Sequence, residues 1–205
     1  MGRSVKRMAM LLAAGMLVVA GPAHAQFSDG YKFLEAVKKK DLEKFNELLQ
    51  GSGSTLVNTK DITTEETGLH IATKRRDVPW MALLIQRGGD VNARDRDGVT
   101  ALVLAANLGF IEGVQLHVDQ KARVDESNDA GETPLISAVH SRNLELARIL
   151  LKAGANPDRS DNSGRSAREY ARTDPRAAQI LAAIEAAARP KTPSPSQRPV
   201  YGPSF

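Results

Sequence analysis

The stretch that decides the fold is GETPLISAVHSRNLELARILLKAGANPDRSD, residues 131–161. Its pattern of small, polar and apolar residues returns along the chain at a constant interval of 33 positions. The interval is kept by a hydroxyl residue at Thr67, Thr100, Thr133 and Ser166, and by an alanine at Ala72, Ala105, Ala138 and Ala171. A constant period of this length indicates stacked copies of one supersecondary unit.

The copy at residues 95–125, DRDGVTALVLAANLGFIEGVQLHVDQKARVD, shows what one unit contains. Gly98 favours a turn, because glycine accepts a positive φ. Thr100 is suited to cap a first helix, and Gly109 to end it in a left-handed conformation. A second helix is expected from Ile111. Each unit is therefore predicted to be a β-turn followed by two antiparallel helices, which bury their apolar faces only when copies stack.

These units resemble the ankyrin repeat. The copy at 131–161 is the most similar, with Thr133-Pro134-Leu135, the segment LELARILL and Gly154-Ala155-Asn156. The resemblance implies an all-α fold, an ankyrin-repeat solenoid of about five β-turn/helix-turn-helix units with degenerate ends. We expect an N-terminal capping repeat at 26–60, ankyrin repeats at 61–94, 95–127 and 128–160, and a C-terminal capping repeat at 161–188.

Some positions depart from the family pattern. The glycine between the two helices survives only as Gly109, and it is replaced by Lys40, Arg76 and Arg142 in other copies. Lys121 likewise stands where Gly88 and Gly154 are found.

Two side chains in the 95–125 copy also occupy places where the family prefers aliphatics. These are Gly113 and His117. We expect the indole of Trp80, one period earlier, to fill the gap beside Gly113, and His117 to be a packing histidine with satisfied hydrogen bonds. The resemblance implies that His70 forms hydrogen bonds between repeats, and we expect His140 to be exposed.

The two ends of the chain differ from the repeats. Residues 1–25 combine three basic residues, an uncharged apolar run and Ala23-His24-Ala25, which is typical of a cleaved signal peptide. The mature chain would begin at Gln26. A retained anchor is the alternative, although the apolar run is shorter than the ~20 residues that span a bilayer. Residues 189–205 hold five of the ten prolines and are predicted to be a disordered tail, with a tether or docking peptide as the alternative.

Composition excludes several classes of function. The chain has no cysteine, which rules out thiol nucleophiles, thiolate metal sites and disulfides. From Gln26 onward 25 basic residues face 24 acidic ones, so the body lacks the basic footprint that nucleic-acid binding needs. Neither a nucleophile elbow nor a phosphate loop is present. We therefore expect no catalytic residue, no metal, no cofactor and no nucleic-acid partner.

A stack of this kind is mostly a surface for a protein partner. The resemblance implies docking on the concave side, at the turn tips and the near ends of the first helices. On this chain the residues of that side are mostly basic in the N-terminal half and become acidic in the third and fourth repeats. We expect a monomer, without stable membrane insertion after cleavage, that docks an exported envelope protein in the bacterial periplasm. A secreted effector and a membrane-tethered scaffold are the alternatives. The predicted partner-binding residues are Lys74, Arg75, Arg94, Arg96, Val99, Asn107, Leu108, Asp129, Glu132 and His140.

Overall fold

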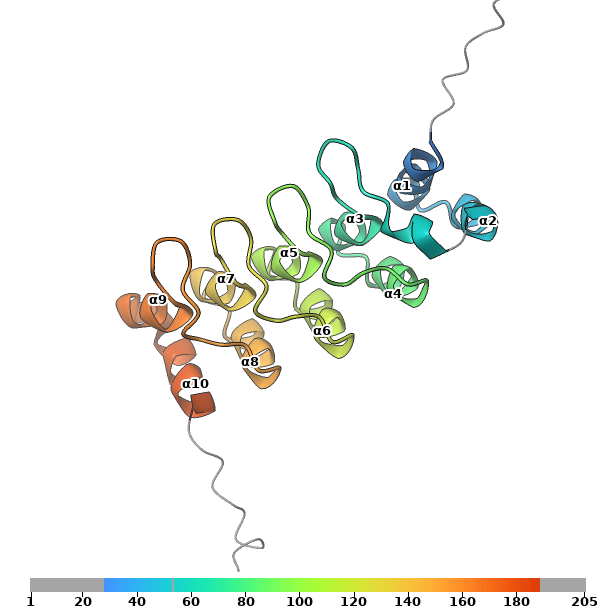
Figure 1. Cartoon of the computed structure of the whole chain (residues 1–205). Coiled ribbons are helices and arrows are strands. Elements are labelled where there is room, and N and C mark those ends of the chain that lie inside the picture. The colour runs from blue at the N-terminus through green and yellow to red at the C-terminus, as the bar shows by residue number, and fades with distance from the viewer. Residues whose placement is uncertain (1–27, 53, 189–205) are drawn as a thin grey trace, which may run out of the picture.

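A computed structural model describes residues 28–52 and 54–188 of the chain (Figure 1). The predicted signal peptide at 1–25 and the predicted tail at 189–205 lie outside these residues. The described part contains five pairs of α-helices and two short 3-10 helices, and no strand beyond isolated bridges. The prediction of an all-α repeat solenoid is therefore confirmed.

The helices form two rows, which run side by side along the stack in Figure 1. Long loops rise from the first row, which we call the inner row. The inner row consists of α1 (Asp29–Lys39), α3 (Gly68–Lys74), α5 (Ala101–Asn107), α7 (Pro134–His140) and α9 (Ala167–Thr173). The outer row consists of α2 (Leu42–Ser52), α4 (Val78–Gln86), α6 (Ile111–Asp119), α8 (Leu144–Lys152) and α10 (Ala178–Ala188), with 3-10 helices at Ser54–Asn58 and Pro175–Ala177.

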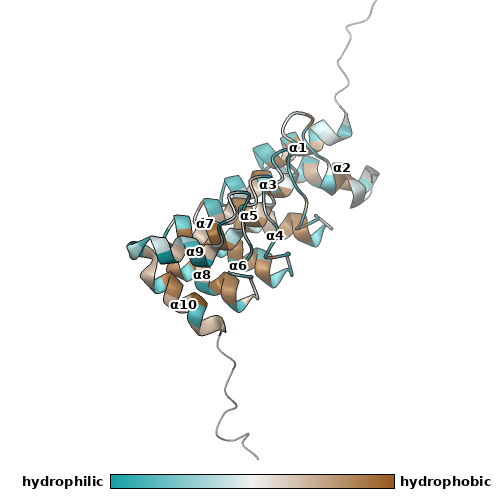
Figure 2. Ribbon diagram, turned by 60° about the vertical axis from the view of Figure 1, so that its left-hand side comes forward, coloured by the Kyte–Doolittle hydropathy of each residue, from teal (hydrophilic) through white to brown (hydrophobic). Residues whose placement is uncertain are grey.

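The core lies where the two rows and the successive repeats meet. Buried apolar side chains come from every helix pair, and most helices in Figure 2 carry both brown and teal residues. Each inner helix packs against the outer helix of its own repeat and against the inner helices of the neighbouring repeats. For example, α5 packs against α6 and against α3 and α7. None of the helices in the described part is long and apolar enough to cross a membrane.

The periodic hydroxyl residues begin the inner helices. The backbone N–H groups of Val103 and Ile136 donate to the hydroxyls of Thr100 and Thr133, each at 3.3 Å. Such a bond satisfies one of the donors that a helix start leaves unpaired. The inner helices α3, α5, α7 and α9 are only seven residues long, so a cap is a large part of what fixes their first turn.

The residues that replace glycine between the helices adopt a left-handed backbone. This region favours glycine, because a Cβ is crowded there. In three repeats the side chain at this position instead reaches the next repeat: Lys40 pairs with Asp77 at 2.6 Å and Arg142 with Asp174 at 2.8 Å, and the Arg76 guanidinium donates to a backbone carbonyl. A contact between repeats thus offsets the backbone strain. The positive φ angles are those of Lys40 (60°), Arg76 (55°), Gly109 (60°) and Arg142 (54°).

His70 joins two repeats, as predicted. Its Nδ1 lies 3.2 Å from the backbone nitrogen of Thr67 and 2.9 Å from that residue's hydroxyl. Its Nε2 lies 2.9 Å from the carbonyl oxygen of Val99 in the next repeat. A tautomer with hydrogen on Nε2 donates to that carbonyl and accepts at Nδ1. Burial lowers the pKa of His70, although the Val99 carbonyl opposes the shift.

Two expectations about the repeat at 95–127 are wrong. Trp80 is buried, as predicted, but its indole packs edge-on against Phe45 at 5.2 Å between ring centroids. The space beside Gly113 is filled by Phe110 of the same repeat, because a Cβ on Gly113 would lie 2.4 Å from that ring. His117 is fully buried, but neither of its ring nitrogens has a hydrogen-bond partner.

Candidate partner-binding surface

The turn tips form an ordered ladder beside the inner row. The tip of each loop donates a backbone hydrogen bond to the tip before it, from Arg96 to Thr64 and from Asp129 to Asp97, each at 3.0 Å. Asn162 continues the ladder toward the preceding loop. The tips therefore present one continuous edge rather than separate loops, and such an edge loses little entropy when a partner docks.

The first loop is one residue longer than the others. Its closing bond runs from Asp61 N–H to the Glu66 carbonyl, whereas the next loop closes from Asp95 to Val99. The extra residue places Ile62 at the tip with 94% of its surface exposed. This isoleucine is held on a fixed loop, since the Asp61 carboxylate accepts from the backbone N–H groups of the two threonines that follow Ile62.

The other end of the same surface carries a polar aromatic cluster. Tyr170 donates its hydroxyl to Asp161 at 2.6 Å, and the guanidinium of Arg165 lies 4.7 Å from the tyrosine ring centroid. The imidazole of His140 packs edge-on against the same ring at 4.6 Å and lies 3.2 Å from a Glu132 oxygen. The Tyr170 hydrogen bond is the main reason that the pKa of Asp161 lies far below its usual range.

The predicted partner-binding residues fall into two groups. Their side chains share this face of the stack, but only half of them are open to solvent. The exposed residues are Lys74, Arg96, Asn107, Asp129 and His140. The partly buried residues are Arg75, Arg94, Val99, Leu108 and Glu132.

Several of the partly buried residues are engaged within the stack. Arg75 donates to the backbone carbonyls of Val37 and Lys38 in the preceding repeat. Arg94 pairs with Glu126 of the next repeat at 2.6 Å. These guanidinium groups therefore connect neighbouring repeats. Each would gain less from binding a partner protein, because it already has close partners within the stack.

Leu108 also differs from its expected role. It was predicted to bind a partner, but it is half-buried and packs against the core. Val99 is also half-buried, and its carbonyl accepts from the His70 ring. Leu108 and Val99 therefore offer a partner less apolar surface than their positions in the sequence indicated.

The expected charge polarity of this face is weakened by pairing. Lys38 lies 3.4 Å from a Glu35 oxygen, and Lys39 lies 3.3 Å from the other oxygen of the same carboxylate. Lys74 pairs with Glu66. Most of the lysines that make the N-terminal half look basic are therefore neutralised by carboxylates of their own or a neighbouring element.

Sequence reasoning missed Ile62 and Tyr170. The signal for Ile62 is present in the sequence: Asp61 and Asp95, which close equivalent loops, are 34 positions apart, whereas Asn128 follows Asp95 by 33. Tyr170 had no such signal, since a tyrosine in a capping repeat is equally compatible with core packing. Its half-buried ring and its four polar neighbours, Asp161, Ser163, Arg165 and His140, become evident only in the folded chain.

The described residues provide little that could perform chemistry. Within 28–52 and 54–188, no group of three or more His, Asp and Glu side chains is placed to hold a metal ion. The polar cluster around Tyr170 and Asp161 consists of hydrogen bonds that are already formed within the repeat.

Comparisons with known proteins identify the family. A model described as ankyrin repeats (3 copies) matches residues 33–128, and a second, ankyrin repeats (many copies), matches residues 116–171. Together the two matches cover more than half of the chain and include all three of its central helix pairs. The chain belongs to the ankyrin-repeat family.

Similar proteins align with this chain over only a part of their own lengths. A B-cell lymphoma 3 protein homolog from Mus musculus is 33% identical over 50% of this chain and 24% of its own length. Serine/threonine-protein kinase 12 from Arabidopsis thaliana is 37% identical over 45% of this chain and 20% of its own. An ADP-ribosylation factor GTPase-activating protein, AGD4, from the same plant is 28% identical over 76% of this chain and 21% of its own. The chain thus spans about a quarter or less of these relatives.

Proposed function

We propose that this chain is a non-catalytic docking module that holds a folded, exported protein in the bacterial periplasm. Membership of the ankyrin-repeat family supports protein binding in general. The observation that carries the proposed site is Ile62, an isoleucine 94% exposed on a loop fixed by hydrogen bonds. An apolar anchor on a rigid loop binds without the cost of ordering that loop.

The residues around Ile62 support the same surface. Arg96 is exposed, and its guanidinium lies 3.4 Å from the Ile62 carbonyl oxygen. At the other end, Arg165 stacks on Tyr170. Tyrosine and arginine are over-represented among the residues that dominate binding energy at interfaces. We therefore propose that Ile62 and the Tyr170–Arg165 pair are the two ends of one contact surface along the turn tips.

The proposal assigns no reaction to the chain. The kinase and the GTPase-activating protein are aligned with it over about a fifth of their lengths. What those names describe belongs to whole proteins of which this chain resembles a part. On this chain the corresponding residues build the solenoid and its surface, so we propose a role that depends on binding alone.

The test of the contact surface is affinity capture from a periplasmic extract with wild-type protein and an Ile62→Asp variant. The matched control is Leu42→Asp, because Leu42 is also an exposed aliphatic residue, at the start of α2. A protein that wild type and control retain and that Ile62→Asp loses, with unchanged circular dichroism, is the expected result. An identical set of retained proteins for all three would overturn the proposed surface.

The cellular location needs its own measurement. Fractionation of the producing cells, with the intact mass of the recovered chain, is expected to find a periplasmic protein that begins at Gln26. A membrane-bound chain that begins at Met1 would favour the tethered scaffold instead. Recovery from the culture medium would favour a secreted effector.

A further inference from the structure

A hollow lies on the opposite side of the stack from the turn tips. It is an open groove of about 710 Å³ between the outer helices α6 and α8. Its apolar floor includes Val118, Val124 and Ile149, each of which is partly exposed. A second hollow of about 700 Å³ continues on the other side of α8, toward α10, where alanines line it.

The cations that line this groove have no ion-pair partners. Lys121, Arg148 and Lys152 are all exposed, and within the described residues none forms an ion pair. Lysines at the inner face behave differently, since Lys38 and Lys74 pair with nearby carboxylates. The outer groove therefore gathers three exposed cations that form no ion pair with the described residues.

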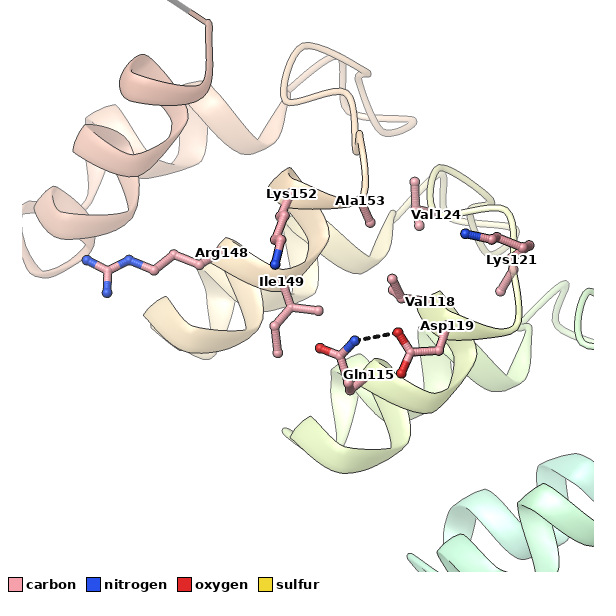
Figure 3. A pocket seen from close by; sticks show the side chains of 10 residues that line it. Gln115, Val118, Asp119, Lys121, Val124, Arg148, Ile149, Lys152 and Ala153 are labelled. Atoms are coloured by element: carbon pink, nitrogen blue, oxygen red, sulfur yellow. Dashed lines mark hydrogen bonds between the residues drawn. The ribbon is translucent and has the colours of Figure 1, made fainter. Parts of the chain in front are cut away.

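The single carboxylate that lines the groove lies on the α6 side. Asp119 accepts a hydrogen bond from the Gln115 amide at 2.7 Å (Figure 3). Arg148 and Lys152 also line the second hollow, which has no acidic lining residue. The potential is accordingly positive along α8 and less so along α6.

The spacing of the cations argues for an extended ligand. Figure 3 shows Lys121 on the α6 side of the opening and Lys152 and Ile149 on the α8 side, while the Arg148 side chain extends toward the far side of α8. A compact anion would reach one cation at a time and would leave the apolar floor uncovered. A peptide segment that alternates carboxylates and aliphatic side chains can pair with the cations and also cover the apolar floor. Its carboxylates can reach Arg148 and Lys152 together, because these two residues are one helical turn apart.

The chain itself does not supply such a segment at its ends. Residues 1–27 and 189–205 contain basic residues and no Asp or Glu. Charge complementarity therefore points to a different molecule. We propose that the groove between α6 and α8 is a second docking site, which binds an acidic, apolar-containing segment of a partner protein through Arg148, Lys152 and Lys121. This site is separate from the turn-tip surface of the proposed function.

The test uses a fluorescent peptide of alternating glutamate and leucine residues, titrated with the purified protein and followed by anisotropy. Arg148→Glu/Lys152→Glu is expected to weaken binding about tenfold or more, since two attractive contacts become repulsive. Arg159→Glu/Arg172→Glu is the control, because it changes the net charge equally at exposed arginines outside the groove. Equal weakening by both pairs would overturn the site, as would a wild type that fails to bind the peptide at millimolar concentration.

Further variants separate the site from its alternatives. Asp119→Asn removes the one opposing carboxylate and is expected to tighten binding several-fold, while Ile62→Asp is expected to leave it unchanged. A peptide with serine in place of leucine that binds equally well would reduce the groove to a general anion-binding patch. Concentration-dependent sedimentation that disappears in Arg148→Glu/Lys152→Glu would make a second copy the occupant. Either result would contradict the proposal.

Discussion

The outer helices α6 and α8 occupy equivalent places in consecutive repeats, but they are packed in different ways. Asn143 caps α8, since its side chain accepts from the backbone N–H of Leu146 at 3.0 Å, and Leu146 is fully buried. At the equivalent position before α6 stands Phe110, whose side chain makes no capping bond, and Gly113 takes the place of that leucine. The two repeats therefore fill the same space from different positions along the chain.

The pairs Asn143/Leu146 and Phe110/Gly113 show that the same backbone can fill its core in two ways. In α8 a small polar residue caps the helix and a large residue three positions later fills the core. In α6 an aromatic residue at the cap position fills the core itself, and glycine makes room for its ring. The repeat at 95–127 therefore lacks a capping bond, which is typically worth ~1 kcal/mol. It also contains a glycine inside a helix, which costs ~1 kcal/mol relative to alanine. We infer that α6 is the weaker of the two helices.

The largest expected effect tests this exchange directly. Phe110→Asn alone is expected to cost ~3 kcal/mol or more by emptying the space beside Gly113. Gly113→Leu alone is expected to be destabilising as well, because its Cβ would meet the Phe110 ring at 2.4 Å. The double variant reproduces the pattern of α8 and is expected to recover most of the loss. Urea unfolding of the four proteins measures the coupling, and additive effects would show that Phe110 is not what fills this space.

A second comparison concerns the core position that is leucine in α4 and α8 and histidine in α6. Leu84, His117 and Leu150 are one period apart, and all three are fully buried. Leu150→Ala is expected to cost 2–5 kcal/mol, roughly, through the cavity that it leaves. His117→Ala is expected to cost much less, because it also removes two unpaired ring nitrogens. Equal losses in urea unfolding would contradict the difference between the helices.

The same histidine predicts a response to acid. Burial, followed by the charge of His70, lowers the pKa of His117 from its ordinary value of about 6.5 to about 4. The unfolded chain therefore takes up a proton first as the pH falls, so stability is lost between about pH 6.5 and pH 4. At pH 5 the loss from this group is on the order of 2 kcal/mol.

His117→Leu separates this effect from other titrating groups. The variant is expected to unfold at higher urea concentration than wild type at pH 5, with a smaller difference at pH 7.5. His70 and Asp161 remain in both proteins, and both have lowered pKa values, so they contribute to acid sensitivity in each. A parallel decline of the two proteins with pH would show that His117 is not the cause.

The smallest expected effect lies at the end of α6. Lys121 has a φ of 61°, whereas the equivalent residue after α8 is Gly154, with a φ of 94°. Unlike Lys40 and Arg142, Lys121 forms no ion pair with the described residues that would offset the strain. Lys121→Gly is expected to stabilise the chain by up to ~1 kcal/mol in thermal unfolding. A loss of stability would mean that the lysine side chain supports the repeat.

The sequence predicted the repeated architecture well because each unit carries its own local signals. The hydroxyl caps, the alanines of the inner helices and the glycines of the turns recur in register, and each acts within a few residues. The N-cap at Asp174 is a signal of the same kind, since its side chain accepts from the backbone N–H of Arg176 and Pro175 follows it directly. Helices that begin with such signals need little long-range information.

The contact surface was predicted less well, because it depends on side-chain direction. Arg94 and Arg96 are two positions apart in the same loop, but Arg94 pairs with Glu126 in the next repeat while Arg96 stays exposed. Trp80 was expected to pack beside Gly113 in the following repeat, but it packs against Phe45 in the preceding one. No local pattern specifies which neighbour a long side chain contacts.

The sequence by itself determined the number of repeats, the positions of their helices and the residues that cap and bury them. These follow from a 33-residue period and from hydrogen bonds within a few residues of one another. Only the tertiary structure decided that Arg94 pairs with Glu126, that His117 is left without partners, and that Lys121, Arg148 and Lys152 line one outer groove. Each of these depends on contacts between repeats, where the identity of a neighbour 30 or more residues away determines whether a side chain is paired, buried or free.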